Sequence, residues 1–358
     1  MNASPSHRPH PAEWTETQSL LPSAERDLPA GRHQFHKEQM MARIHEDLRT
    51  PSRTSGTSPV APVKRSNPFL RRAVLLPAAA FALAGAVVGG LALTGGADDG
   101  RTALATGPAL TTRIGAADAK GAPQLLERIS LAAADTSAPA PRRGQYIYIA
   151  SKVADTYVKT VGDKSEVVSD ELHSRQVWNS IDGRDGWLIE AGATSDKGIT
   201  LKGDTPFTGA YNALAELPTD PDTLLRRIYR ESDAVRDPEV PRDQAAFVAI
   251  GDLLFESYPP AEVGAALYKA AAKIPGVVAV NDAVDATGRH GVAIARESDG
   301  ERTEWIFDKK TLQFLGQRIV VVKATAGDPL KVGTVTHTSA ITERAVVDAN
   351  KQLPGQVS

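Results

Sequence analysis

The sequence predicts an α+β protein with a single transmembrane helix and an extracytoplasmic curved antiparallel sheet (a half-barrel) that has helices packed on one face. Three observations lead to this prediction. The run 73–97 contains 25 residues without a charge, and at ~1.5 Å per residue it reaches about 37 Å, against a hydrocarbon core of ~30 Å. Strand-like segments then precede a block of helical segments. More strand-like segments follow that block, which is typical of an α+β fold.

The charges on either side of the apolar run predict its orientation. Lys64, Arg65, Arg71 and Arg72 precede it, and two aspartates follow it. The positive-inside rule therefore places residues 1–72 in the cytoplasm and residues 98–358 outside. A cleaved signal peptide is disfavoured, because 72 residues come first and the run exceeds a typical apolar core. A buried soluble helix is disfavoured because each glycine in it would cost about 1 kcal/mol.

Two glycines inside the run have the spacing of a helix-packing motif. Gly85 and Gly89 form a G-x-x-x-G pair, which in membrane helices allows close helix–helix contact and homodimer formation. An Ala/Gly-rich composition explains the same pair without any dimer.

The cytoplasmic part, residues 1–72, is expected to be mostly disordered except for one amphipathic helix at 31–49. Met40, Met41, Ile44 and Leu48 form its apolar stripe, with charged residues elsewhere. We interpret the stripe as a partner-binding surface. The alternatives are that the helix lies on the membrane or is only marginally helical.

Outside the membrane we predict three regions. Residues 98–144 are expected to form a stalk with a short helix at 123–135, residues 145–325 an α+β domain, and residues 326–358 a C-terminal strand and tail. Within the domain, alternating and β-branched residues predict strands, and apolar residues at helical spacing predict helices. The expected strands are 145–151, 156–161, 171–181, 186–191, 277–283, 290–297, 303–308, 314–323 and 333–340; the expected helices are 221–232, 243–258 and 260–274.

Composition excludes several classes of site. The chain has no cysteine, so disulfides, cysteine–zinc sites and thiol catalysis are ruled out. Residues 1–72 carry 11 Lys/Arg and 7 Asp/Glu, a net charge of +4, and residues 98–358 carry 30 and 36, a net charge of −6. Neither value is extreme enough to indicate direct binding of nucleic acid.

No catalytic, metal or cofactor motif stands out, so we expect no enzyme activity, no metal and no cofactor. The G-x-S-x-G, P-loop, G-x-G-x-x-G and H-E-x-x-H patterns are missing from the sequence. His33 and His36 are spaced to share a metal but have no third ligand nearby. Asp182 and Asp185 fit a hairpin turn better than a calcium loop.

Part of the C-terminal half resembles the closing meander of lipoprotein-carrier-like domains. The resemblance rests on residues 288–293 (GRHGVA), 305–308 (WIFD) and 311–316 (TLQFLG). It implies an unclosed β-barrel with helices on its concave side, and it covers about 50 residues.

Residues 28–323 also resemble a family of uncharacterised actinobacterial single-span membrane proteins. The matching segments are 28–33 (LPAGRH), the apolar run, 145–148 (QYIY), 217–221 (LPTDP), 265–268 (AALY) and 274–277 (IPGV). This resemblance implies a partner of extracytoplasmic-function sigma factors. The chain lacks the His-x-x-x-Cys-x-x-Cys pattern of zinc-type anti-sigma domains, so any sigma-factor binding would require the helix at 31–49.

Together these features favour a regulatory or signal-sensing membrane protein with a cytoplasmic sigma factor or other regulator as partner. The alternative is an envelope carrier that binds a lipid or lipoprotein. For the carrier, Tyr146, Tyr148 and Trp187 are the expected lining of a ligand groove.

Overall fold

The computed structural model describes residues 104–136, 140–161, 164–202, 207–324 and 327–356. The expected membrane span with Gly85 and Gly89, and the expected helix with Met40, Met41, Ile44 and Leu48, lie outside these residues. None of the helices within the described ranges has the length and apolar character needed to cross a membrane.

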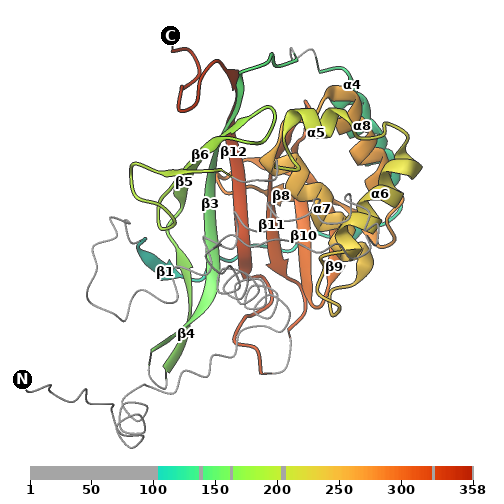
Figure 1. Ribbon diagram of the computed structural model, residues 1–358. Coiled ribbons are helices and arrows are strands. Elements are labelled where there is room, and N and C mark those ends of the chain that lie inside the picture. Colours follow the sequence, from blue (N-terminus) through green and yellow to red (C-terminus); the bar gives the residue numbers. More distant parts are fainter. Residues whose placement is uncertain (1–103, 137–139, 162–163, 203–206, 325–326, 357–358) are drawn as a thin grey trace, which may run out of the picture.

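The described residues form an α+β fold built on one large open antiparallel sheet (Figure 1). Ten of its twelve strands follow the order β2-β8-β9-β10-β11-β12-β3-β5-β6-β7; off this path, β4 pairs with β3 and with β1. The strands are β1 Thr106–Pro108, β2 Ala117–Asp118, β3 Tyr146–Val161, β4 Lys164–Asp170, β5 His173–Ser180, β6 Gly186–Glu190, β7 Ile199–Thr200, β8 Val277–Val284, β9 His290–Ser298, β10 Glu301–Asp308, β11 Phe314–Val321 and β12 Val335–Val347.

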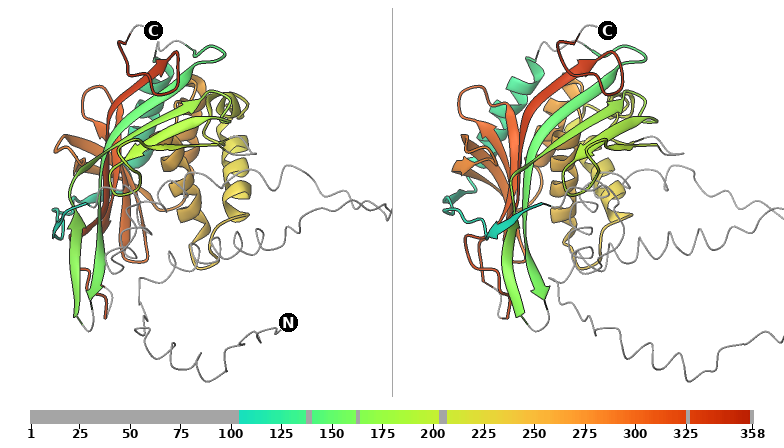
Figure 2. Two further views of the ribbon diagram at one scale, coloured as in Figure 1. Left: turned by 60° about the vertical axis from the view of Figure 1, so that its left-hand side comes forward. Right: turned by 90° about the vertical axis from the view of Figure 1, so that its left-hand side faces the viewer.

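The helices cover one side of the sheet, which we call the inner face; the opposite side is the outer face. Figure 2 shows α6, α7 and α8 on the inner side of the curved sheet. The helices are α4 Ala122–Ala134, α5 Tyr211–Ala215, α6 Pro221–Asp233, α7 Arg242–Glu256 and α8 Ala261–Ala271. α6 begins as the sequence predicts, with Pro221 in its first turn and the Asp220 carboxylate accepting a hydrogen bond from the Thr223 amide at 2.9 Å.

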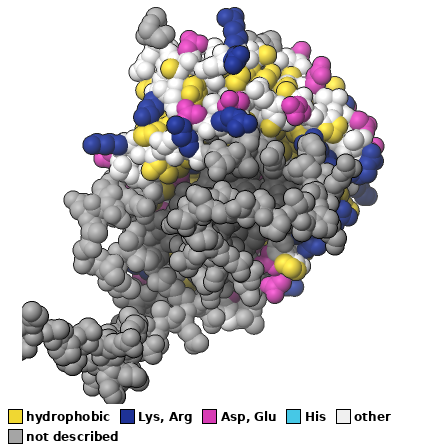
Figure 3. Space-filling model, viewed as in Figure 1, with side chains coloured by type: hydrophobic (Ala, Val, Ile, Leu, Met, Phe, Trp, Pro, Cys, Tyr) yellow, Lys and Arg dark blue, Asp and Glu magenta, His cyan; other side chains and the backbone are white. Residues whose placement is uncertain are grey.

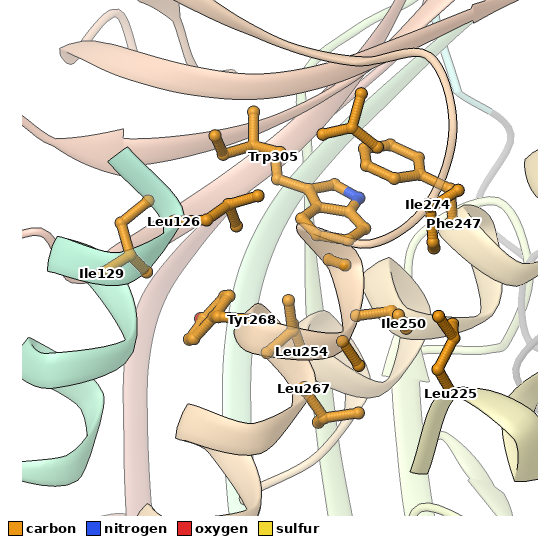
Figure 4. Packing of buried hydrophobic residues seen from close by; sticks show 14 of the residues in the cluster. Leu126, Ile129, Leu225, Phe247, Ile250, Leu254, Leu267, Tyr268, Ile274 and Trp305 are labelled. Atoms are coloured by element: carbon orange, nitrogen blue, oxygen red, sulfur yellow. The ribbon is translucent and has the colours of Figure 1, made fainter. Parts of the chain in front are cut away.

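Alternate residues of β9 and β10 pack against these helices and form the main core (Figure 4). The Trp305 indole stacks on the Phe247 ring of α7, with centroids 3.9 Å apart and planes 4° apart. The rings of Tyr268 of α8 and Phe307 pack edge to face, with their centroids 5.6 Å apart. Gly251 gives α7 its close approach, since a Cβ there would collide with the Trp305 side chain.

The expected strands and helices after residue 145 are largely confirmed, with three differences. β3 is a single strand of 16 residues rather than two short strands, because its polar middle pairs continuously with β12. β4, the short strand β7 and the short helix α5 were not predicted. β12 continues to Val347 and lies at the centre of the sheet, between β11 and β3.

The segment before the predicted domain is not a free stalk where the structure describes it. Helix α4 matches the expected helix and packs in the main core through Leu126 and Ile129. Residues 104–118, which we call the strap, pair with β4 through β1 and with β8 through β2. Between these strands, the Thr112 amide donates to the Gly333 carbonyl oxygen at 2.8 Å. The strap therefore crosses the sheet from one end to the other.

Candidate functional site

The most concentrated polar chemistry lies on the inner face, where β5 and β6 meet the end of α7. Arg175 of β5 is paired in register with Ser151 of β3 and with Glu190 of β6. Because side chains alternate along a strand, His173 and Arg175 point to the same face. Glu256, the last residue of α7, reaches Arg175 from the helix layer. We call His173, Arg175, Glu190, Glu256 and the nearby Arg344 the inner ion cluster.

Arg175 is the centre of this cluster. Its Nη2 lies 3.1 Å from Oε2 of Glu256, and its Nε lies 3.2 Å from Oε2 of Glu190. The Nε2 of His173 is 3.5 Å from the other oxygen of Glu190. These four side chains are at most 6% exposed. A buried charge is tolerated only when it is paired, so each member depends on the others.

Burial and charge change the acidity of these groups in opposing ways. Burial raises the pKa of Glu256, and the Arg175 guanidinium only partly offsets this. Burial alone would lower the pKa of His173, but the neighbouring Glu190 carboxylate and the Glu171 carbonyl outweigh it and raise the pKa above its ordinary value. Glu256 and His173 therefore bind a proton more readily than exposed groups of the same types.

Arg344 of β12 adds a second guanidinium beside the end of α7. Its Nη2 donates a hydrogen bond to the Leu254 carbonyl oxygen at 2.7 Å. Burial lowers the pKa of Arg344, and the charges of Tyr268, Tyr258 and Glu256 act in the opposite direction. This arginine holds the C-terminal end of α7 against the sheet, where the last carbonyls of a helix favour a cation.

Several polar atoms of the cluster lack a hydrogen-bond partner within the described part of the chain. They are buried and lie on neighbouring residues, and they include both donors and acceptors. The atoms are Arg175 Nη1, Glu256 Oε1 and Arg344 Nε, together with the Oγ of Ser151, which is paired in register with Arg175. Buried polar atoms are nearly always paired in stable interiors, so this concentration is typical of a functional or hydrated site.

The polar character continues along the inner face toward the lower end of β3 in Figure 1. His337 of β12 and Asp155 of β3 are paired in register, and the His337 Nδ1 lies 2.8 Å from the Asp155 Oδ1. Further along, the Tyr157 hydroxyl donates to Asp170 at 3.2 Å. This half of the inner face thus offers charged and hydrogen-bonding groups rather than a continuous apolar lining.

A second buried ion group lies on the outer face, beneath the strap. Glu304 of β10 accepts from the Nε of Arg302 at 2.9 Å and from the Nε of Arg318 at 2.6 Å. The same two arginines hold the strap, since Arg302 donates to the Gly115 carbonyl oxygen and Arg318 donates to the Thr112 hydroxyl, both at 3.0 Å. This group fixes the strap rather than forming an accessible site.

The three expected groove residues are together, but on the outer face. Tyr148 alternates with Ile147 and Ile149, which pack toward Tyr211 and Tyr258 on the inner side. Tyr146, Tyr148 and Trp187 form an apolar cluster with Trp178, and the C-terminal tail lies against it. The Trp178 Nε1 donates to the Gln352 carbonyl oxygen at 2.7 Å, and the Lys351 ammonium lies 3.3 Å from the centroid of the Trp187 ring.

No single stretch of sequence indicates the inner ion cluster. Arg175 and Glu190 fall in expected strands, and Glu256 falls in an expected helix 66 residues later. The alternation of His173, Arg175 and Val177 was the one available signal, because it places two basic side chains on the face that also carries apolar residues. Their carboxylate partners follow only from the fold.

On the face drawn in Figure 3, the Lys/Arg and Asp/Glu side chains of the described residues are interspersed. Within the described ranges no group of three or more His, Asp or Glu side chains is arranged to hold a metal ion. The inner ion cluster places one buried arginine against two carboxylates, one of which also contacts a histidine. In comparisons with known proteins, no protein-family model and no curated protein matches the chain.

Proposed function

We propose that the chain is a single-pass membrane protein of the regulatory or signal-sensing type, with residues 1–72 in the cytoplasm. Its extracytoplasmic domain senses a polar ligand or partner through the inner ion cluster. In the cytoplasm, the stripe of Met40, Met41, Ile44 and Leu48 binds a sigma factor or another regulator. The span at 73–97 joins the two parts, with Gly85 and Gly89 available for a homodimer contact.

The observation that carries the sensing role is the ion pair between Arg175 and Glu256. This pair joins the β5–β6 end of the sheet to the end of α7, so it links the helix layer to the part of the sheet beyond β12. Its groups are buried and incompletely hydrogen-bonded. A proton or a charged ligand that competes for either partner therefore has a large effect on this contact.

The carrier alternative has one observation in its favour, the apolar cluster of Tyr146, Tyr148 and Trp187. This cluster lies under the C-terminal tail, and the inner face near β3 carries charged groups that suit acyl chains poorly. Analysis of lipids extracted with the purified full-length protein tests this alternative. A stoichiometric lipid would favour the carrier over the sensor.

The regulatory proposal is tested by capture of partners with the full-length protein from native membranes. The test variant changes Met41, Ile44 and Leu48 to Asp. The control variant changes Gln39, Arg43 and Glu46 to Asp, on the opposite side of the expected helix. Both variants alter the charge equally: the first adds three negative charges, and in the control Gln39 contributes one, Arg43 two and Glu46 none.

We expect the wild-type protein and the control variant to capture the same transcriptional regulator, and the stripe variant to lose it. Equal capture by both variants would overturn the role of the stripe. Capture of no regulator by the wild-type protein would overturn the proposed function.

A further inference from the structure

The start of the strap lies at one edge of the sheet, beside the turn between β4 and β5. The Glu171 amide donates to the Ala105 carbonyl oxygen at 2.9 Å, and Thr106 pairs with Asp170 in the β1–β4 ladder. Leu104 lies against Gly192, since a Cβ built at Gly192 would be 2.7 Å from the Leu104 Cδ1. The first described residue is thus held between the β4–β5 turn and the loop after β6.

The length of chain before Leu104 limits how far this edge lies from the expected membrane span. Six residues, 98–103, separate Leu104 from the last residue of the span. A fully extended chain advances at most ~3.6 Å per residue, so the seven steps from residue 97 to residue 104 cover at most about 25 Å. This upper limit rests on the span of the proposed function, and it holds for every conformation of those six residues.

The side chains beside Leu104 suit a lipid headgroup region. Leu172, in the β4–β5 turn, is 45% exposed although it is a large apolar residue. Lys152 lies on a neighbouring strand, with its ammonium donating to the Ser174 hydroxyl at 2.7 Å, two residues along β5 from Leu172. This part of the edge thus carries an exposed leucine and, bonded to the residue two positions further along, a lysine. At a membrane interface an apolar chain can enter while a cation stays with the phosphates.

We propose that the edge of the sheet around Leu104 and Leu172 rests on the outer surface of the bilayer, with Leu172 among the lipid headgroups. The short connection then keeps the domain against the membrane. The strap passes from this edge across the outer face to β8 and is held there by Arg302 and Arg318. The sheet is therefore coupled to the end of the span through a short connection and a firmly bound strap.

Exposed leucines elsewhere supply matched control positions. Leu353, 38% exposed, follows β12, whose last residue Val347 pairs with Tyr146 at the start of β3. Leu172 precedes His173, which pairs with Val153 of β3. Val153 lies seven residues after Tyr146, which corresponds to about 23 Å along the strand. Leu131, 58% exposed, lies on α4, which packs beside β8 near the other end of the sheet.

The test uses the full chain in lipid nanodiscs with a single cysteine in turn at each position: Leu172→Cys, Leu353→Cys and Leu131→Cys. The natural chain has no cysteine, so a fluorophore attaches only at the chosen site. Lipids that carry a spin label on the headgroup then quench nearby fluorophores. Because all three leucines are exposed, the labels leave the core intact, and circular dichroism checks the fold.

We expect severalfold stronger quenching at residue 172 than at residues 353 and 131. Equal quenching at the three positions, in protein that has inserted into the nanodiscs, would overturn the bilayer contact and leave the membrane span unaffected. Failure of the protein to insert would overturn both the span and this inference. The two failures are therefore distinguishable.

Discussion

The Arg175 Nη2 lies 3.1 Å from the Glu256 Oε2, and this ion pair joins β5 to the last residue of α7. Arg175 also lies 3.2 Å from Glu190 on β6. One arginine thus balances two buried carboxylates from different elements. Since a buried charge that loses its partner is far more costly than an exposed one, this contact is the sensitive point of the domain.

Arg175→Met is expected to lower the free energy of unfolding by about 3–5 kcal/mol, because it removes the guanidinium that contacts both buried carboxylates. Denaturant unfolding of the full-length protein measures the change. Arg227→Met is the control, since Arg227 makes an ion pair with Glu231 on the exposed side of α6, and such pairs contribute below about 1 kcal/mol. Similar losses in both variants would contradict the central role of Arg175.

The stability contributed by His173 is expected to depend on pH. Its folded-state pKa is raised above the ordinary value, so its contribution is fully present below about pH 6.5 and is lost as the pH rises through the folded-state pKa. The difference in unfolding free energy between wild type and His173→Gln should therefore shrink from mildly acidic to mildly basic pH. Urea unfolding at several pH values measures it.

The matched experiment repeats this comparison in a Glu190→Gln background, where the carboxylate that raises the pKa of His173 is gone. Asp155, Asp170 and the Glu171 carbonyl remain near the histidine. We expect the pH dependence to become much weaker. A pH dependence that is unchanged in this background would show that Glu190 is not its cause.

The strap is expected to depend on Gly115. A Cβ at this position would be 2.6 Å from the Val280 side chain and 2.9 Å from the Asp282 carbonyl oxygen, so Gly115→Val should lift the strap from β8. We expect a loss of about 1–3 kcal/mol and faster proteolysis within residues 104–121. Gly107→Val on the same strap is the control, because a Cβ there meets no atom within 4 Å; equal effects would argue against a tightly packed strap.

Two helix glycines should respond to alanine in opposite directions. In Gly251→Ala the new methyl group collides with Trp305, so the packing of α7 on the sheet should weaken and the melting temperature should fall. In Gly264→Ala the nearest atom is 3.8 Å away, in Pro259, so better helix propensity should raise stability by up to about 1 kcal/mol. A gain in both variants would contradict the close contact between α7 and Trp305.

Local signals in the sequence are sufficient to predict most of the elements. The Asp220–Pro221 pair marks the start of α6, and apolar spacing marks α7 and α8. Long-range pairing is not visible in this way. β3 was expected as two strands, 145–151 and 156–161, with Lys152 to Asp155 between them. In the structure Lys152 pairs with both β12 and β5, and Asp155 pairs with β12.

The candidate site could not be predicted for a related reason. The inner ion cluster joins residues that are up to 171 positions apart, from His173 to Arg344, and only the order of strands brings them together. The three aromatic groove residues were correctly expected on strands. Which face they occupy depends on the pleat of β3, and the helices cover the face that carries Ile147 and Ile149.

The most direct test of the whole account is the orientation of the chain in the membrane of its host. Two single-cysteine variants, Ser6→Cys and Leu353→Cys, are treated with a membrane-impermeant maleimide before and after permeabilisation. We expect residue 353 to be labelled in intact cells and residue 6 to be labelled only after permeabilisation. Labelling of residue 6 in intact cells, or protection of residue 353, would contradict the single span and with it the proposed sensor.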